Sequence, residues 1–145
     1  MGPVVVDSNI VIAAVVHVPY TLSARKLVGQ WTADDIDLVA PLLWEYEIVS
    51  ALRKFIYVGH MKLDDAFEAM AQVFSMNVTT ISQTIEGYKL ALQWADRLGN
   101  FTAYDAQYLA LTEQLEADFW TADRRLAHLA QQAGASWVHW LGERG

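Results

Sequence analysis

The chain has 145 residues, of which 54% are hydrophobic, and it carries a formal net charge of −7 with no cysteine. This length and hydrophobic content predict one folded domain over residues 1–145 and exclude intrinsic disorder. The lack of cysteine excludes a disulfide framework and thiolate metal sites, and the acidic charge argues against binding nucleic acid through a general basic surface.

Short segments rich in β-branched residues alternate along the chain with longer segments of helical periodicity. The expected strands are 4–6, 37–41, 77–81, one within 117–123, and 136–141. The expected helices are 20–33, 42–59, 62–76, 82–100 (starting at a Ser82 cap and ending at Gly99), 102–116 and 124–135. This alternation predicts an α/β fold, a three-layer α/β/α sandwich around a mostly parallel sheet of about five strands.

Three acidic residues stand where a strand ends or a helix begins. Asp7 follows the valines of the first strand, Asp123 follows the fourth strand, and Asp105 lies at the start of the helix over 102–116. Taken alone, each acid is explained as well by a role as a helix cap or a favourable charge at a helix amino terminus as by a functional role. Thr102 with Asp105, for example, resembles a capping box.

A parallel sheet, however, brings positions of this kind to one edge. Several carboxylates at one edge repel one another and raise each other's pKa unless a cation neutralises them. Hard divalent cations such as Mg²⁺ or Mn²⁺ are the ions that suit a set of carboxylate oxygens.

The helix over 42–59 offers two further acids, Glu45 and Glu47. They are two residues apart, so they project from different faces of the helix and at most one of them can reach a shared site. Leu52 and Ile56 share the face of Glu45, whereas Lys54 lies nearer Glu47, and periodicity alone does not choose between the two.

Four segments in order, VVVDSN, PLLWEYEIVSALRK, TAYDAQYLALTEQL and FWTADRRL, resemble the PIN domain. Within that superfamily they are most similar to the VapC toxins of bacterial and archaeal toxin–antitoxin pairs, and the resemblance covers essentially the whole chain. It places the catalytic and metal-binding acids of the family on Asp7, Glu47, Asp105 and Asp123. It thereby selects Glu47 over Glu45, and it gives three polar residues that orient these acids or meet the substrate, which are Asn9, Thr121 and Ser50.

The resemblance implies an endoribonuclease that hydrolyses RNA phosphodiester bonds with a water activated by one or two Mg²⁺ or Mn²⁺ ions. It also implies the toxin of a type II pair, with a VapB-like antitoxin as its partner and a homodimer as its assembly. The aromatic and aliphatic residues of 42–59 and 62–76 are expected to form the docking surface. Arg53 and Lys54 are candidates to line the cleft. Arg124 and Arg125 either contact RNA phosphates or lie on a solvated helix face, and the second interpretation is preferred.

Two alternatives are weighed against this reading. A non-catalytic PIN-fold binding module is expected to lack one of the four acids, and none is missing. A haloacid-dehalogenase-like phosphatase needs a second aspartate two positions after the first, where this chain has Asn9.

No targeting signal is expected, because the apolar start lacks a basic region and contains Asp7, and no run of about 18 apolar residues could span a membrane. A cytoplasmic location is therefore expected.

Overall fold

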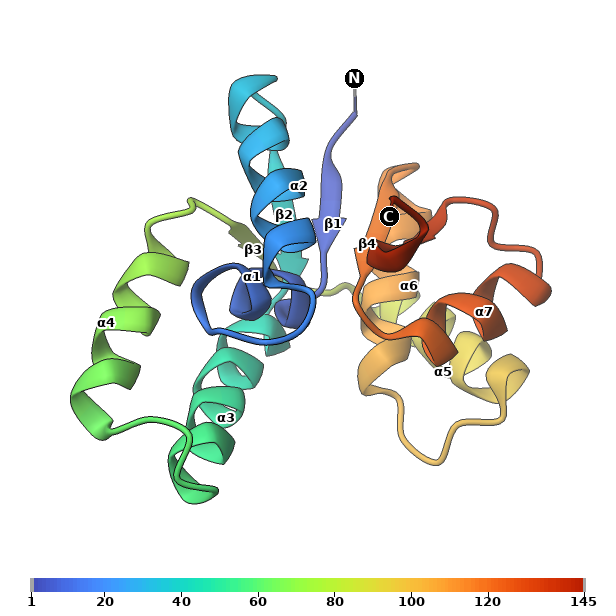
Figure 1. Ribbon diagram of the computed structural model, residues 1–145. Coiled ribbons are helices and arrows are strands. Elements are labelled where there is room, and N and C mark those ends of the chain that lie inside the picture. The colour runs from blue at the N-terminus through green and yellow to red at the C-terminus, as the bar shows by residue number, and fades with distance from the viewer. Residues whose placement is uncertain (1, 145) are drawn as a thin grey trace.

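The computed structural model describes residues 2–144 and contains one five-stranded parallel sheet flanked by helices (Figure 1). The strands are β1 (Val4–Val6), β2 (Leu38–Pro41), β3 (Thr79–Ile81), β4 (Asp118–Thr121) and β5 (Val138–Trp140). The helices are α1 (Ser8–Val15), α2 (Thr21–Ala33), α3 (Leu43–Tyr57), α4 (Leu63–Phe74), α5 (Ile85–Leu98), α6 (Tyr104–Leu115), α7 (Arg124–Gln132) and the short 3-10 helix η1 (Leu141–Arg144). The predicted α/β fold with five strands is confirmed.

The strand order is β3-β2-β1-β4-β5, and every pair of neighbouring strands is parallel. The chain therefore builds outward from β1 to β3, then crosses back and adds β4 on the other side of β1. In open parallel sheets, sites form beyond the carboxyl ends of the strands at such a reversal of direction. The reversal lies between β1 and β4, whose carboxyl ends lead into Asp7 and Asp123.

The two faces of the sheet are covered by different helices, as the contacts of β4 show. Trp120 packs edge-on against Trp31 of α2, with ring centroids 6.1 Å apart, whereas Phe119 packs against Tyr108 of α6 at 5.4 Å. Because successive residues of a strand point to opposite faces, α2 and α6 lie on opposite sides of the sheet. Figure 1 shows the same division, with α1 to α4 on one side and α5 to α7 on the other, which is the expected three-layer arrangement.

Helix α5 begins later than the sequence predicts. Its cap is Thr84, whose side-chain oxygen accepts a hydrogen bond from the backbone N–H of Gly87 at 3.1 Å, so Ser82 is not the cap. Both residue types cap helices well, so local sequence does not favour the later one. The predicted end is confirmed, since Gly99 adopts a left-handed conformation with φ of 69°.

No helix in the described part of the chain is long and apolar enough to cross a membrane.

Candidate active site

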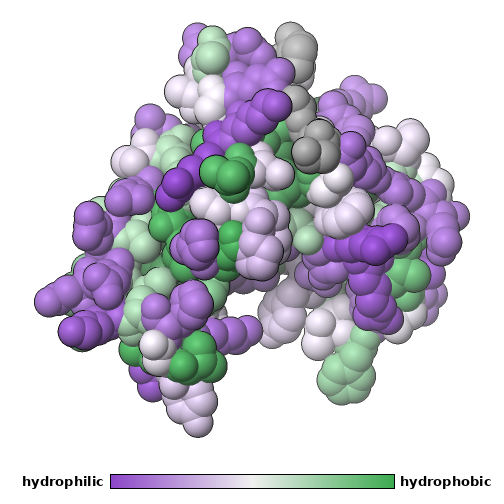
Figure 2. Space-filling model, in the orientation of Figure 1, coloured by the Kyte–Doolittle hydropathy of each residue, from purple (hydrophilic) through white to green (hydrophobic). Residues whose placement is uncertain are grey.

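The four predicted acids come from four different elements that meet at the carboxyl edge of the sheet. Asp7 follows β1, Asp123 follows β4, Glu47 lies on α3, and Asp105 lies in the first turn of α6. Figure 2 shows the surface hollowed at this edge, between the part built by α3 and α4 and the part built by α5 to α7. The fold therefore gathers carboxylates that are up to 116 positions apart in the sequence.

Asp7 is the buried member of the set, with only 6% of its surface exposed. One carboxylate oxygen accepts a hydrogen bond from the Thr121 hydroxyl at 2.8 Å and from the Asn9 amide at 3.3 Å, and the other lies 3.4 Å from the Ser8 hydroxyl. The side chain makes no capping hydrogen bond to α1. Burial, followed by the charge of Glu47, raises the pKa of Asp7 to about 7.

Asn9 and Thr121 tie the β1–α1 junction to the β4–α7 junction. The Asn9 side-chain oxygen accepts from the backbone N–H of Ala122 at 3.0 Å, while its amide lies 3.3 Å from the Thr121 hydroxyl oxygen. That hydroxyl oxygen in turn accepts from the backbone N–H of Asp123 at 3.0 Å. The two polar side chains thus fix the position of the Asp7 carboxylate relative to the neighbouring strand.

Glu47 points into the same site from α3. One of its oxygens accepts a hydrogen bond from the Tyr108 hydroxyl at 2.5 Å and lies 3.3 Å from the Ser8 hydroxyl. Burial is the main cause that raises the pKa of Glu47, and the charge of Asp105 raises it further. Because a hydroxyl has a single proton, Ser8 donates to either Asp7 or Glu47 but not to both at once.

Glu45 takes the opposite direction. It is exposed and accepts a hydrogen bond from the Thr80 hydroxyl of β3 at 3.4 Å, away from the other carboxylates. The helical geometry of α3 thus separates the two glutamates, and Glu47 is the one that lies in the site.

Asp105 and Asp123 close the other side of the cluster. Asp105 is half-buried, and burial, followed by the charge of Asp123, raises its pKa. Ala103 precedes α6 with no side-chain cap, so the capping box expected from Thr102 does not form. Asp123 is exposed and does cap its helix, because one carboxylate oxygen accepts from the backbone N–H of Leu126 at 3.1 Å.

Other predicted residues lie outside this set of contacts. Ser50 is exposed one turn beyond Glu47, and among the described residues its hydroxyl forms no hydrogen bond with a site carboxylate. The Arg124 guanidinium lies 5.2 Å from the centre of the Trp140 ring, so this arginine covers an aromatic side chain on the surface.

Tyr108 and Ser8 are site residues that the sequence analysis missed. Tyr108 is fully buried and also packs on Phe119, so on the sequence it is indistinguishable from an ordinary core tyrosine. The available signal was its spacing, since it follows Asp105 by three residues and shares that face of the helix. Ser8 was visible only as part of the polar interruption after β1.

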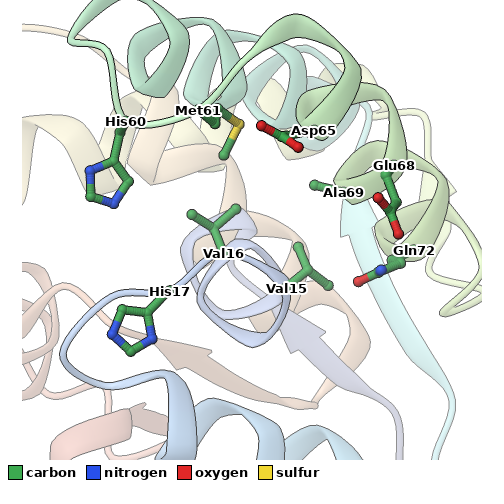
Figure 3. A pocket seen from close by; sticks show the side chains of 9 residues that line it. All are labelled: Val15, Val16, His17, His60, Met61, Asp65, Glu68, Ala69 and Gln72. Carbon is green, nitrogen blue, oxygen red and sulfur yellow. The ribbon is translucent and has the colours of Figure 1, made fainter.

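A second cavity, of about 380 Å³, lies at the far end of α1 (Figure 3). His17 and His60 lie on one side of it, while Asp65 and Glu68 of α4 lie on the other, with Val16 between the two pairs. The imidazoles and carboxylates therefore do not converge on one point. Throughout residues 2–144, no three His, Cys, Asp or Glu side chains lie close enough to hold an ion directly.

Comparison with known proteins places the chain in a family. A sequence profile described as the PIN domain matches residues 5–134, and the chain therefore belongs to the PIN domain family. Among solved structures, the crystal structure of PAE2754 from Pyrobaculum aerophilum is similar, with a TM-score of 0.66 and 23% sequence identity, over 88% of this chain and 79% of that chain. At this identity the likeness shows a shared fold alone. No curated protein matches the chain.

PIN domains are generally nucleases and typically use divalent metal ions. The donor set at the carboxyl edge fits a hard cation, because it consists of carboxylate oxygens whose charges oppose one another. Three of the four carboxyl groups have a raised pKa, which is the response expected where negative charge is gathered and partly buried without a neutralising partner. Mg²⁺ usually binds one or two carboxylates and keeps several waters, so it does not require three ligands in direct contact.

Proposed function

We propose that the protein is a Mg²⁺- or Mn²⁺-dependent endoribonuclease that hydrolyses RNA phosphodiester bonds, and that it is the toxin of a type II toxin–antitoxin pair. Membership of a family of nucleases supports the reaction class. The observation that carries the proposal is Asp7, a buried carboxylate that faces Glu47 and Asp105 instead of capping its helix.

In this proposal Asp7, Glu47, Asp105 and Asp123 hold one or two cations, directly or through water. The chemistry that a bound divalent cation supplies here is activation of a water molecule and stabilisation of charge on the phosphodiester. The hydrogen bonds from Thr121 and Asn9 orient Asp7, and those from Tyr108 and Ser8 orient Glu47. Such supporting contacts keep the carboxylates aimed at one place.

The pKa of Asp7 links cation binding to pH. With a pKa of about 7, the Asp7 carboxyl group is half protonated in the cation-free protein near neutral pH. Only the ionised carboxylate is a good ligand, so cation binding releases this proton. Cation affinity is therefore expected to rise between about pH 6 and pH 8.

The partners proposed are a VapB-like antitoxin and a second copy of the chain, with a cytoplasmic location where RNA is the substrate. Exposed apolar side chains on α3 and α4 support a docking surface: Tyr46, Val49, Tyr57, Leu63 and Phe67. Between these two helices lies an apolar cavity of about 190 Å³. Apolar groups gathered in this way are typical of protein–protein contact surfaces.

The test is the variant Asp7→Asn, which keeps the size of the side chain and one acceptor oxygen but removes its charge. We expect cleavage of single-stranded RNA in Mn²⁺ to fall by about a thousandfold, since several kcal/mol of transition-state stabilisation are lost. Growth arrest on expression should disappear with it, while the circular dichroism spectrum stays that of the folded protein. Cleavage at the wild-type rate would remove Asp7 from the active site.

A non-catalytic binding module is separated from the enzyme by isothermal titration with Mn²⁺ at neutral pH. The enzyme is expected to bind the ion and Asp7→Asn to bind it much more weakly. Neither cleavage nor Mn²⁺ binding by the wild-type protein would favour the binding module.

A further inference from the structure

A cavity of about 230 Å³ opens beside the acidic cluster, between α1 and α3. Ser8 and Asn9 line it, and they are two of the three described residues whose side chains hydrogen-bond Asp7. The cavity therefore shares a wall with the candidate active site. Its other lining residues include Lys54, Tyr20 and Phe55.

Lys54 gives this cavity a positive charge. It follows Glu47 by seven residues on α3, which places both on one face of the helix two turns apart. The Lys54 ammonium is close enough to the Glu47 carboxylate to interact with it electrostatically. Within residues 2–144 the exposed Lys54 side chain forms no ion pair, and its ammonium is available to a ligand.

The neighbouring cation, Arg53, projects elsewhere. Its guanidinium lies 5.7 Å from the centre of the Tyr57 ring, and it lines the apolar cavity between α3 and α4. Of the two basic residues that the sequence offered as candidates for the cleft, Lys54 lines the cavity beside the acidic cluster and Arg53 does not. Arg53 is therefore a control that matches Lys54 in charge and helix but not in direction.

Two aromatic side chains complete the cavity. Tyr20 immediately precedes α2 and is 41% exposed, so one part of its ring is free for contact. Phe55 is partly buried, and its ring packs on His60 with centroids 5.6 Å apart. A cation beside an exposed ring is the combination with which proteins bind single-stranded nucleic acid, through a phosphate and a stacked base.

We propose that this cavity is a nucleotide subsite that holds one residue of a single-stranded RNA next to the bond to be cleaved. Lys54 contacts a phosphate, and the Tyr20 ring stacks on the base. The inference rests on the proposed ribonuclease function and adds to it the residues that hold a nucleotide beside the cleaved bond and the direction in which the strand leaves the acidic cluster.

The charges beyond this cavity limit the subsite to about one nucleotide. Phe55 contacts His60, which lines the next cavity along α1 (Figure 3). That cavity carries the carboxylates of Asp65 and Glu68, which would repel a further phosphate. The strand is therefore expected to turn toward solvent after contacting Lys54.

The experiment measures binding of a fluorescein-labelled single-stranded oligoribonucleotide by anisotropy in EDTA, where metal-dependent cleavage is off. We expect Lys54→Met to weaken binding about fivefold and to make the slope of log affinity against log salt less negative by about 0.7, the value for one phosphate contact. Tyr20→Ala should weaken binding roughly tenfold with little change in that slope, because stacking is not ionic. Tyr20→Phe should bind like the wild type.

Arg53→Met is the matched control and should leave both affinity and slope unchanged. Equal losses in Lys54→Met and Arg53→Met would indicate a general charge effect and overturn the subsite, as would wild-type affinity in Lys54→Met or no RNA binding by the wild type. Binding of a polyglutamate peptide is a further test. If the peptide requires Lys54 and Tyr20 for binding and RNA does not, the cavity binds a protein segment and the nucleotide subsite is overturned.

Steady-state cleavage of the same RNA in Mn²⁺ separates this proposal from the proposed function. Lys54→Met and Tyr20→Ala should raise KM while changing kcat less than about twofold, since both residues bind substrate outside the reacting centre. If the wild type cleaves RNA and the two variants have unchanged KM, the subsite fails and the nuclease stands. If the wild type cleaves no RNA in any divalent metal, the nuclease fails, whatever the anisotropy shows.

Discussion

The two strand-to-helix junctions of β1–α1 and β4–α7 carry the same residue type in the same local position, yet they use it differently. Asp123 is exposed and caps α7 through the backbone N–H of Leu126. Asp7 is buried, does not cap α1, and receives its hydrogen bonds from side chains, chiefly from Thr121 of the neighbouring strand. An aspartate after a parallel strand therefore serves the helix at one junction and the site at the other.

The difference comes from what lies over each junction. Asp7 is covered by Ser8, by Thr121 and by Glu47 of α3, so it loses water and lies beside another carboxylate. Burial of a charge without a cationic partner is costly, whereas an exposed cap is favourable. An energetically costly arrangement persists in a fold where it serves a function. Of the two aspartates, Asp7 is therefore the stronger candidate for a functional residue.

The largest expected effect is on the pH dependence of stability. The carboxyl group of Asp7 ionises at 3.8 in an unfolded chain and at about 7 in the folded protein. Between these values the folded state binds more protons, so the free energy of unfolding falls as pH rises from about 4 to about 7 and stays lower above that. The loss amounts to about 4 kcal/mol at most, or roughly 10 °C in Tm.

Thermal unfolding followed by circular dichroism in EDTA at pH 5 and pH 8 measures the part of this loss that falls between those pH values, about 3 kcal/mol. Asp7→Asn should remove most of the difference, and the matched variant Asp123→Asn at the other junction should retain it. Adding Mn²⁺ at pH 8 should raise the Tm of the wild type much more than that of Asp7→Asn. An unchanged pH dependence in Asp7→Asn would mean that the burial of Asp7 carries no energetic penalty.

A smaller effect is expected for Tyr108→Phe, which tests how the buried junction is held together. This change removes the hydroxyl that donates to Glu47 at 2.5 Å but keeps the ring that packs on Phe119. We expect RNA cleavage to fall about tenfold, as is typical when a contact that orients a metal ligand is lost.

The control is Glu45→Gln, which should leave cleavage within about twofold of the wild type because Glu45 faces Thr80 outside the site. Full activity in Tyr108→Phe would show that Ser8 alone suffices to hold Glu47.

The smallest effect belongs to the exposed junction. Asp123→Ala removes the cap of α7 and should lower the free energy of unfolding by about 1 kcal/mol, whereas Asp123→Asn should be nearly neutral because asparagine also caps helices. Chemical denaturation at pH 7 measures both changes. If Asp123→Ala and Asp123→Asn lose equal stability, the cap contributes nothing to the stability of α7. Asp123 would then resemble Asp7, which does not cap its helix, more than the structure indicates.

Local patterns were enough to locate the strands and most of the helices. Strands such as Val4–Val6 are short apolar runs bounded by polar residues, and Gly99 ends α5 where the sequence expects it. Helix starts were less certain, because Ser82, Thr84 and Thr102 are all acceptable caps and local sequence does not say which one the packed chain uses.

For the candidate site, too, one part could be predicted from the sequence and another part could not. The sequence supplied the acids and their positions at strand ends, and a family resemblance was needed to choose Glu47, because helical periodicity separates it from Glu45 without saying which face meets the sheet. The contact between Tyr108 and Glu47 forms where α6 and α3, from opposite faces of the sheet, meet at its carboxyl edge. The place of Lys54 depends on how α3 packs against α1, and no local pattern encodes either arrangement.

The sequence by itself determined the α/β fold and the presence of acidic residues where parallel strands end, because hydrophobic periodicity and residue type act over a few neighbours. Only the tertiary structure decided that Asp7 is buried while Asp123 is exposed and that Tyr108 holds Glu47. It also decided that Lys54 lines the cavity beside the acidic cluster while Arg53 lines another. Burial and electrostatic coupling are properties of groups brought together from distant parts of the chain, so they appear only once the layers have packed.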